Sequence, residues 1–309
     1  MPPTIQWPEG KRFAFTIFDD TDSATVENVG PVYAFLRDLG FKTTKSVWPI
    51  AGDKQPVLGG STCEDDDYRQ WLLQLRDEGF EIALHNATYH DSSREETIQA
   101  FQQYKEIFGS DPRSLANHTS NAEGIYWGAD RVSGIRAPFY KVLTRFKRRR
   151  FRGHREGDPL FWGDICKERL KYVRNFVFAD INTLAACPLM PYHDPTRPYV
   201  NYWFASAEGG TLESFNRTIS EENQDRLEAE GGACVMYTHF AKGFYRNGEI
   251  EPRFRQLMQR LSKKQGWFVP VTELLDYIQD KQGRHELTPR QRASLEWKWL
   301  RHKVLVGTT

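Results

Sequence analysis

The chain has 309 residues, of which 39% are hydrophobic and 27% charged, and its formal net charge is +1. This length and composition suit one large folded domain, and the near-zero net charge gives no general reason to expect nucleic-acid binding. No run of about 18 apolar residues and no N-terminal signal pattern occurs, so we expect a cytoplasmic protein with at most peripheral membrane contact.

Short apolar runs alternate with segments whose apolar residues recur every three or four positions, as they do in helices. The predicted strands are 13–18, 43–48, 80–85, 114–118, 133–137, 176–180, 233–239 and 266–269. The predicted helices are 24–39, 67–78, 93–108, 221–230, 252–265 and 271–281. This alternation favours a parallel sheet. Seven or eight such units predict an α/β fold, a distorted (β/α) barrel. A doubly wound open sheet is the alternative.

Two parts of the chain depart from this regular alternation. Within the barrel domain, residues 1–283, the segment 141–232 holds a basic run and several prolines, so we expect an irregular insertion on the barrel rim. The tail 284–309 begins with a capping sequence at Thr288 and predicts a helix to about Lys303. That helix would dock on the barrel, on a second subunit or on a membrane.

Residues suited to metal binding or proton transfer follow three of the predicted strands. Asp19 and Asp20 follow the first strand, His85 ends the third with His90 five residues further on, and His239 ends a later strand. In β/α barrels the catalytic groups lie at the carboxyl ends of the strands. One Asp and two His can hold a catalytic Zn²⁺ with an open position, and a spare carboxylate can accept a proton.

These residues resemble motifs of the polysaccharide deacetylase superfamily, also called NodB-homology or carbohydrate esterase family 4. The family's first motif is a strand that runs into Asp-Asp, and Phe15-Thr-Ile-Phe-Asp-Asp20 matches it. Its second motif is a histidine pair after a Glu-Ile strand. The stretch from Glu81 to His90 matches it with one extra residue between the histidines.

The resemblance implies a role for each of these residues. It makes Asp19 the general base, His239 the catalytic acid or its substitute, and a divalent metal, most often Zn²⁺, the cofactor. The implied metal ligands are Asp20, His85 and His90.

The family's third motif, Arg-x-Pro, is displaced in this chain. Asn117 and His118 stand where the motif is expected, and Arg136-Ala-Pro138 occurs one unit later. The fourth motif, Asp-x-Trp, has no counterpart. We therefore expect the substrate contacts to come from Asn86, Asn117, His118 and Arg136.

The implied activity is removal of an acetyl or formyl group from an acylamino sugar, in intracellular surface-polysaccharide or O-antigen assembly. Two alternatives remain open: an amide hydrolase of this superfamily that acts on a small non-sugar substrate, and a degenerate barrel that only binds glycan. The basic run 141–155 is either a solvated face or an anion site for a nucleotide-linked or lipid-linked sugar. A homo-oligomer is also compatible with the sequence.

Overall fold

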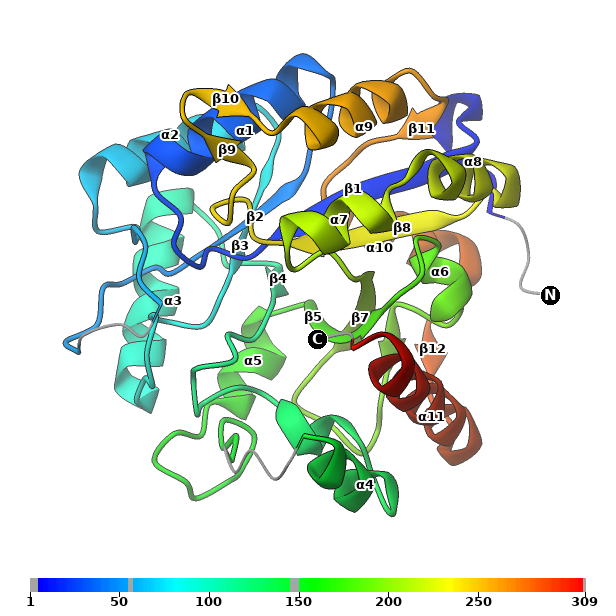
Figure 1. Ribbon diagram of the computed structural model, residues 1–309. Helices are drawn as coiled ribbons and strands as arrows, with labels where there is room; N and C mark the ends of the chain where they lie inside the picture. Colours follow the sequence, from blue (N-terminus) through cyan, green and yellow to red (C-terminus); the bar gives the residue numbers. More distant parts are fainter. Residues whose placement is uncertain (1–4, 55–57, 145–149, 308–309) are drawn as a thin grey trace.

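The computed structural model describes residues 5–54, 58–144 and 150–307. Among them, seven parallel strands close a ring in the order β1-β2-β3-β4-β5-β7-β8, and β8 pairs again with β1 (Figure 1). The distorted β/α barrel predicted from the sequence is confirmed, and the open sheet is excluded. The ring strands are β1 (Phe13–Asp19), β2 (Thr44–Val47), β3 (Glu81–Leu84), β4 (Ser114–Leu115), β5 (Tyr172–Phe178), β7 (Tyr202–Ala207) and β8 (Ala233–Thr238).

Short strands extend the ring at two places. β11 (Gly266–Trp267) pairs with β1, and β6 (Tyr192–His193) pairs with β7 and with β12 (His285–Glu286). β9 (Tyr245–Arg246) and β10 (Glu249–Ile250) form a separate hairpin. The helices pack outside the strands. They are α1 (Val26–Asp38), α2 (Asp66–Asp77), α3 (Arg94–Phe108), α4 (Arg136–Leu143), α5 (Gly163–Arg169), α6 (Thr183–Ala186), α7 (Leu212–Thr218), α8 (Glu221–Glu230), α9 (Pro252–Ser262), α10 (Val271–Gln282) and α11 (Pro289–Val306).

The predicted strand 133–137 is wrong, because this segment enters helix α4 instead. Gly134 has a φ of +57°, which ends the extended path, and Pro138 lies in the first helical turn, where the missing N–H is tolerated. The segment 141–232, where we expected an irregular insertion, supplies the ring strands β5 and β7.

The ring strands are buried on both faces, as expected for a parallel sheet covered by helices. Every residue of β1, β5 and β8 is buried. Charged residues in these strands and their neighbours therefore lie away from water and need partners. Lys45 in β2 and Arg174 in β5 are two such residues, and both pair with acids that follow or end β1.

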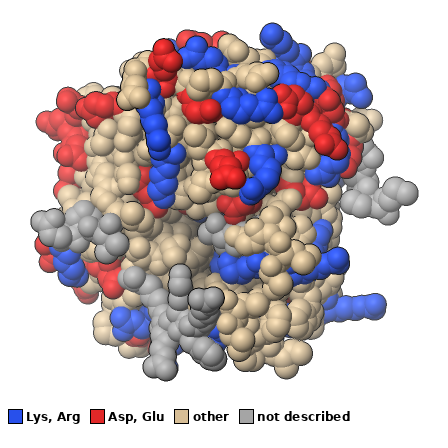
Figure 2. Space-filling view, in the orientation of Figure 1, with Lys and Arg blue, Asp and Glu red and all other residues tan. Residues whose placement is uncertain are grey.

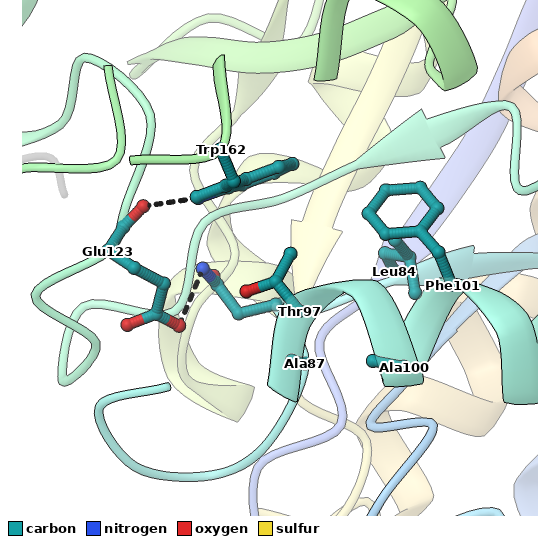
Figure 3. A pocket seen from close by; sticks show the side chains of 8 residues that line it. Leu84, Ala87, Thr97, Ala100, Phe101, Glu123 and Trp162 are labelled. Carbon is teal, nitrogen blue, oxygen red and sulfur yellow. Dashed lines mark hydrogen bonds between the residues drawn. The ribbon is translucent and has the colours of Figure 1, made fainter. Parts of the chain in front are cut away.

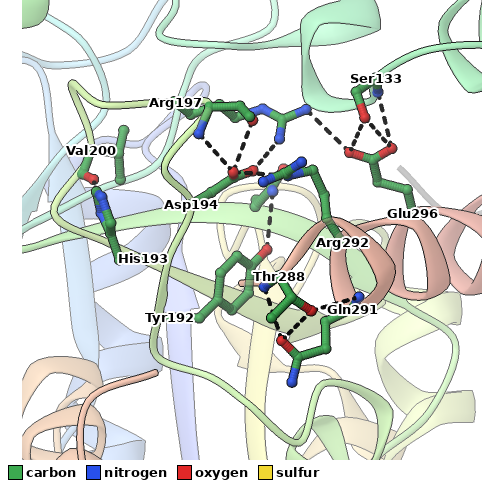
Figure 4. A network of polar contacts seen from close by, with 12 residues as sticks. Ser133, Tyr192, His193, Asp194, Arg197, Val200, Thr288, Gln291, Arg292 and Glu296 are labelled. Carbon is green, nitrogen blue, oxygen red and sulfur yellow. Dashed lines mark hydrogen bonds and ion pairs between the residues drawn. The ribbon is translucent and has the colours of Figure 1, made fainter. Parts of the chain in front are cut away.

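The C-terminal segment is joined to the barrel by strand pairing and by a buried polar network. Asp194 accepts hydrogen bonds from Arg197 and from Arg292 of α11, and Glu296 of α11 pairs with Arg197 (Figure 4). Glu296 also accepts hydrogen bonds from Ser133. Helix α11 is thus fixed to the loops that surround β6.

Two further features are the cysteines and, among the residues that the structure describes, the absence of a membrane-spanning helix. All four cysteines are free and buried. In the described ranges, no helix has both the length and the apolar character needed to cross a bilayer.

Candidate active site and metal centre

Four buried side chains meet just beyond the carboxyl ends of β1, β3, β4 and β8. Asp22 lies at their centre. Its Oδ1 is 3.3 Å from His85 Nε2 and 3.5 Å from His118 Nε2, and its Oδ2 is 3.2 Å from His239 Nε2. Ligand atoms placed tetrahedrally around a metal at about 2.0–2.1 Å are roughly 3.3 Å apart. The spacing of Asp22 Oδ1, His85 Nε2 and His118 Nε2 therefore suits a cation bound between them.

The three histidines are oriented so that Nε2 faces Asp22. Nδ1 of His85 lies 2.9 Å from the Ala116 carbonyl, and Nδ1 of His239 lies 2.9 Å from the Gly210 carbonyl. A carbonyl oxygen can only accept, so each Nδ1 carries a proton and donates. In a neutral ring the Nε2 lone pair then points at the carboxylate. Metal-binding histidines are held in this way by a hydrogen bond from the other ring nitrogen.

His118 follows the same arrangement, with Nδ1 2.8 Å from Asn121 Oδ1. Burial, together with the charge of the neighbouring His85, lowers the pKa of His118 to about 4. The ring is therefore neutral at pH 7. Its Nε2 and Asp22 Oδ1 are buried and have no hydrogen-bond partner among the described residues. Two unsatisfied acceptors that face each other are costly unless a cation lies between them.

The charge states of the other two groups also fit this site. Burial alone would raise the pKa of Asp22, but the neighbouring imidazoles of His239, His85 and His118 outweigh burial and lower it. Burial would lower the pKa of His239, but its hydrogen bond to Asp22 and the charge of Asp20 raise it instead. Asp22 is therefore a carboxylate at neutral pH, and the raised pKa of His239 favours a proton on that ring.

Asp20, a predicted metal ligand, lies beside the cluster but is paired with an arginine. Arg174 donates to both of its oxygens, at 2.8 and 2.6 Å. Asp20 Oδ2 is 3.9 Å from His85 Nε2. Burial would raise the pKa of Asp20, but the Arg174 charge outweighs burial and lowers it. The guanidinium also lies 4.3 Å from the ring centre of Tyr237. Asp20 is thus a fixed carboxylate at the edge of the site.

Asp19, the predicted general base, is enclosed by donors. Its Oδ2 accepts a hydrogen bond from Tyr33 at 3.1 Å and lies 2.8 Å from Lys45 Nζ. Its Oδ1 accepts from the Phe240 backbone N–H at 2.8 Å. Both carboxylate oxygens therefore hold parts of the barrel together.

The structure does not bring His90 to this cluster. Its Nδ1 lies 2.8 Å from the Asp91 carbonyl, and its Nε2 accepts from Lys54 N and lies 3.6 Å from Asp53 Oδ1. His90 groups instead with Asp53 and Glu96. The extra residue between His85 and His90 turns the second ring away, and His118 takes the place beside Asp22.

The four residues predicted to bind substrate have different surroundings. His118 belongs to the cluster, and Asn86 lies behind it, because Asn86 Oδ1 accepts from the His118 N–H at 2.7 Å. The side-chain amide of Asn117 donates a hydrogen bond to the Ile125 carbonyl and accepts one from the Ile125 N–H. Arg136, on α4, pairs instead with Glu296 of α11.

Glu123 supports the site from behind. Its Oε1 accepts from Asn86 at 3.1 Å and from Asn121 at 2.6 Å, and its Oε2 accepts from the Ser92 N–H at 3.2 Å. Burial raises the pKa of Glu123 to about 7. This carboxyl is one of the groups that line a cavity of about 10 Å³, which is close to the smallest space that holds a water molecule. Figure 3 shows the lining side chains.

Sequence reasoning missed Asp22, Lys45, Glu123 and Arg174. Asp22 had a visible signal, since it is the third acid in the short stretch Asp19-Asp-Thr-Asp22. Arg174 interrupts the apolar strand Tyr172–Phe178, and a charge at such a position needs a buried acid as a partner. Lys45 lies in the mostly polar stretch Thr44–Val47 and gives a weaker signal. Glu123 lies in an irregular loop and carries no such signal.

No protein-family model and no curated protein sequence matches the chain. Solved structures do match it. A probable polysaccharide deacetylase from Pseudomonas aeruginosa PAO1 has a TM-score of 0.55 at 11% identity, over 91% of this chain and 95% of that one. Puue allantoinase has a TM-score of 0.52 at 12% identity, over 91% and 94%. At these identities the likeness shows the fold: the chain has the barrel of the polysaccharide deacetylases, in a divergent form, as its motifs implied.

Proposed function

We propose that this protein is a metal-dependent hydrolase that removes an acetyl or formyl group from an acylamino sugar. The observation that carries the proposal is the cluster of Asp22, His85 and His118, in which Asp22 Oδ1 and His118 Nε2 face each other buried and unsatisfied. These three residues would hold the metal. A divalent ion, with Zn²⁺ the best match to this donor set, supplies Lewis-acid activation of a water molecule and of the amide carbonyl.

Asp20 is the best placed residue for the general base. It borders the cluster, is a carboxylate at neutral pH and is oriented by Arg174. In the reaction, the water oxygen bonds to the acyl carbon while Asp20 accepts a proton from that water. Asp20 thus takes the role that the sequence analysis gave to Asp19. Asp19 instead orders the barrel through Lys45 and Tyr33.

His239 is the proposed acid. Its pKa is raised and its Nε2 faces the site, so a protonated ring can give its proton to the leaving nitrogen as the amide C–N bond breaks. The products are a free amino sugar and acetate or formate. Water supplies the oxygen and both protons that the products gain.

The substrate is proposed to carry a nucleotide or a lipid diphosphate, because a cytoplasmic enzyme meets its acylamino sugars in that form. The basic run 141–155 supports an anion site, although residues 145–149 lie outside the described ranges. Two of its described members have acidic partners, since Arg152 pairs with Asp158 and Arg155 with Asp130.

A small non-sugar amide is the second candidate substrate. The similarity to Puue allantoinase, which by its name acts on a small amide, favours it. Both candidates use the same cluster, so a substrate panel separates them. A degenerate, non-catalytic barrel is disfavoured by the intact set of ligand, base and acid.

The test is to load the purified protein with Zn²⁺ and to assay two kinds of substrate. Acetate and formate release is measured with nucleotide-linked, lipid-linked and free acylamino sugars, and ring opening is measured with allantoin as the loss of intact allantoin. Acid release from a linked sugar above that from the free sugar is the expected result. Ring opening of allantoin without acid release from any sugar would select the second candidate. A protein that binds no metal and releases no acid would overturn the proposal.

A further inference from the structure

The exposed apolar side chains of this protein gather on one part of its surface. Ten large hydrophobic residues are exposed in the described ranges, and eight of them lie on or next to α4 and α11. Their exposed fractions run from 37% to 72%. We call them the α4/α11 surface: Ile135, Phe139, Val142, Leu143, Trp297, Val304, Leu305 and Val306. Large apolar patches on a soluble protein mark interaction sites.

This surface is also basic. Helix α4 contains two cations and no acid, and α11 contains five cations and a single acid, Glu296. Glu296 is buried and paired with Arg136 and Arg197, so it adds no negative charge to the surface. Arg136 and Arg292 pair with buried acids, whereas Lys141, Arg290 and Arg301 are exposed, so the charge that these two helices present to solvent is positive. Figure 2 shows tan and blue atoms over this region, at the lower right.

The two helices form a fixed unit. The rings of Phe139 and Trp297 are 5.7 Å apart, and those of Tyr140 and Trp299 stack at 5.5 Å. The Arg136 Nε lies 2.5 Å from Glu296 Oε2. The apolar side chains therefore keep their arrangement before any partner arrives, which lowers the entropic cost of binding.

We propose that the α4/α11 surface binds the anionic face of a lipid membrane. A bilayer interface takes up Trp and aliphatic side chains, while anionic headgroups attract the cations around them. Lys141 and Arg301 are exposed among the apolar residues and would lie near the headgroups. A second copy of the chain fits less well, because a self-complementary contact would bring two basic surfaces together without acids to pair them.

The experiment is sedimentation of the full chain with vesicles of phosphatidylcholine alone or mixed with phosphatidylserine. Binding is expected only to the mixed vesicles and is expected to fall as salt is raised. The affinity of the variant Lys141→Glu/Arg301→Glu for the mixed vesicles should fall by at least about tenfold. Phe139→Ser/Trp297→Ser should also lose most binding, because its apolar contact area is gone.

Matched controls place the same changes elsewhere on the surface. Ile98→Ser on α3 and Arg255→Glu on α9 alter exposed residues away from α4 and α11, and both should bind as the unmodified chain does. Thermal unfolding of each variant checks that it is folded. Equal binding to both kinds of vesicle, or equal loss in the controls, would overturn the proposal. So would a dimer in sedimentation velocity that Phe139→Ser/Trp297→Ser dissociates, since a second copy would then cover the surface.

The proposal is independent of catalysis. A membrane-bound protein without deacylase activity would leave it intact, and an active enzyme that ignores vesicles would remove it without touching the proposed function.

Discussion

Oδ2 of Asp22 lies 3.2 Å from Nε2 of His239, although this histidine follows the strand β8, more than 200 residues further along the chain. The other oxygen of the same carboxylate faces His85 and His118. One short side chain thus connects four strand ends, because β8 returns to β1 and closes the ring. Loss of this carboxylate should affect the whole site.

The first prediction concerns the metal ligands. Asp22→Asn and His118→Gln should each lose most of the bound metal, because each removes a ligand atom from the cluster. His90→Gln should retain the metal, since His90 lies with Asp53 and Glu96 instead. Metal content after dialysis, measured by mass spectrometry, tests all three. If His90→Gln loses the metal while Asp22→Asn keeps it, the ligand set implied by the family motifs is the right one.

The second prediction separates the two adjacent acids. Asp20→Asn should keep the metal and lose about 10²–10⁴-fold in kcat, the usual contribution of a general base. Asp19→Asn should mainly lower stability, because it leaves Lys45 with a weaker partner. Metal content, kcat and the unfolding midpoint are measured for both variants. A stable Asp19→Asn protein with the larger loss in kcat would return the base to Asp19.

The third prediction concerns the ion pair between Lys45 and Asp19. Loss of Lys45 alone should lower the free energy of unfolding more than loss of both partners together. Both side chains are fully buried, and removing one partner of a buried ion pair costs about 3–5 kcal/mol. Lys45→Met should therefore lower the free energy of unfolding by that amount. The double variant Lys45→Met/Asp19→Asn should recover part of the loss, since no charge is then left alone. Urea unfolding of the four proteins measures the coupling. Additive losses would show that the two residues act separately.

Much of the barrel was predictable because its signals are local. The apolar run before Asp19 and the capping box at Ser93 each mark an element boundary, and the structure places β1 and α3 there. Strand β7 was missed, because Tyr202-Trp-Phe-Ala-Ser-Ala207 follows a proline-rich loop and not a clear helical pattern. Its identity as a strand depends on its neighbours β5 and β8.

The site was predictable only in part, for a related reason. His85 and His239 end clear strands, so their placement at the rim followed from the strand pattern. Whether Asp20 or Asp22 faces the histidines depends on which acid Arg174 binds. That arginine lies on a distant strand, and the pairing is set by ring closure. Spacing along the chain carries no information about it.

The last prediction concerns Glu123 and pH. Its pKa is raised to about 7 in the folded protein, by burial, from an unfolded value of about 4.3. The folded state therefore holds this proton more tightly than the unfolded state. The stabilising effect is complete below about pH 4.3 and is lost as pH rises toward 7. The loss corresponds to about 3–4 kcal/mol.

Glu123→Gln is the matched comparison, because the amide does not titrate while the other groups remain. The free energy of unfolding is measured for both proteins from pH 4.5 to 8 in the same metal-free buffer. As pH rises, the free energy of unfolding of the unmodified protein should fall relative to that of Glu123→Gln. This difference should level off above about pH 7. A difference that stays constant across this range would mean that Glu123 is ionised throughout. The three donors Asn86, Asn121 and Ser92 would then outweigh burial.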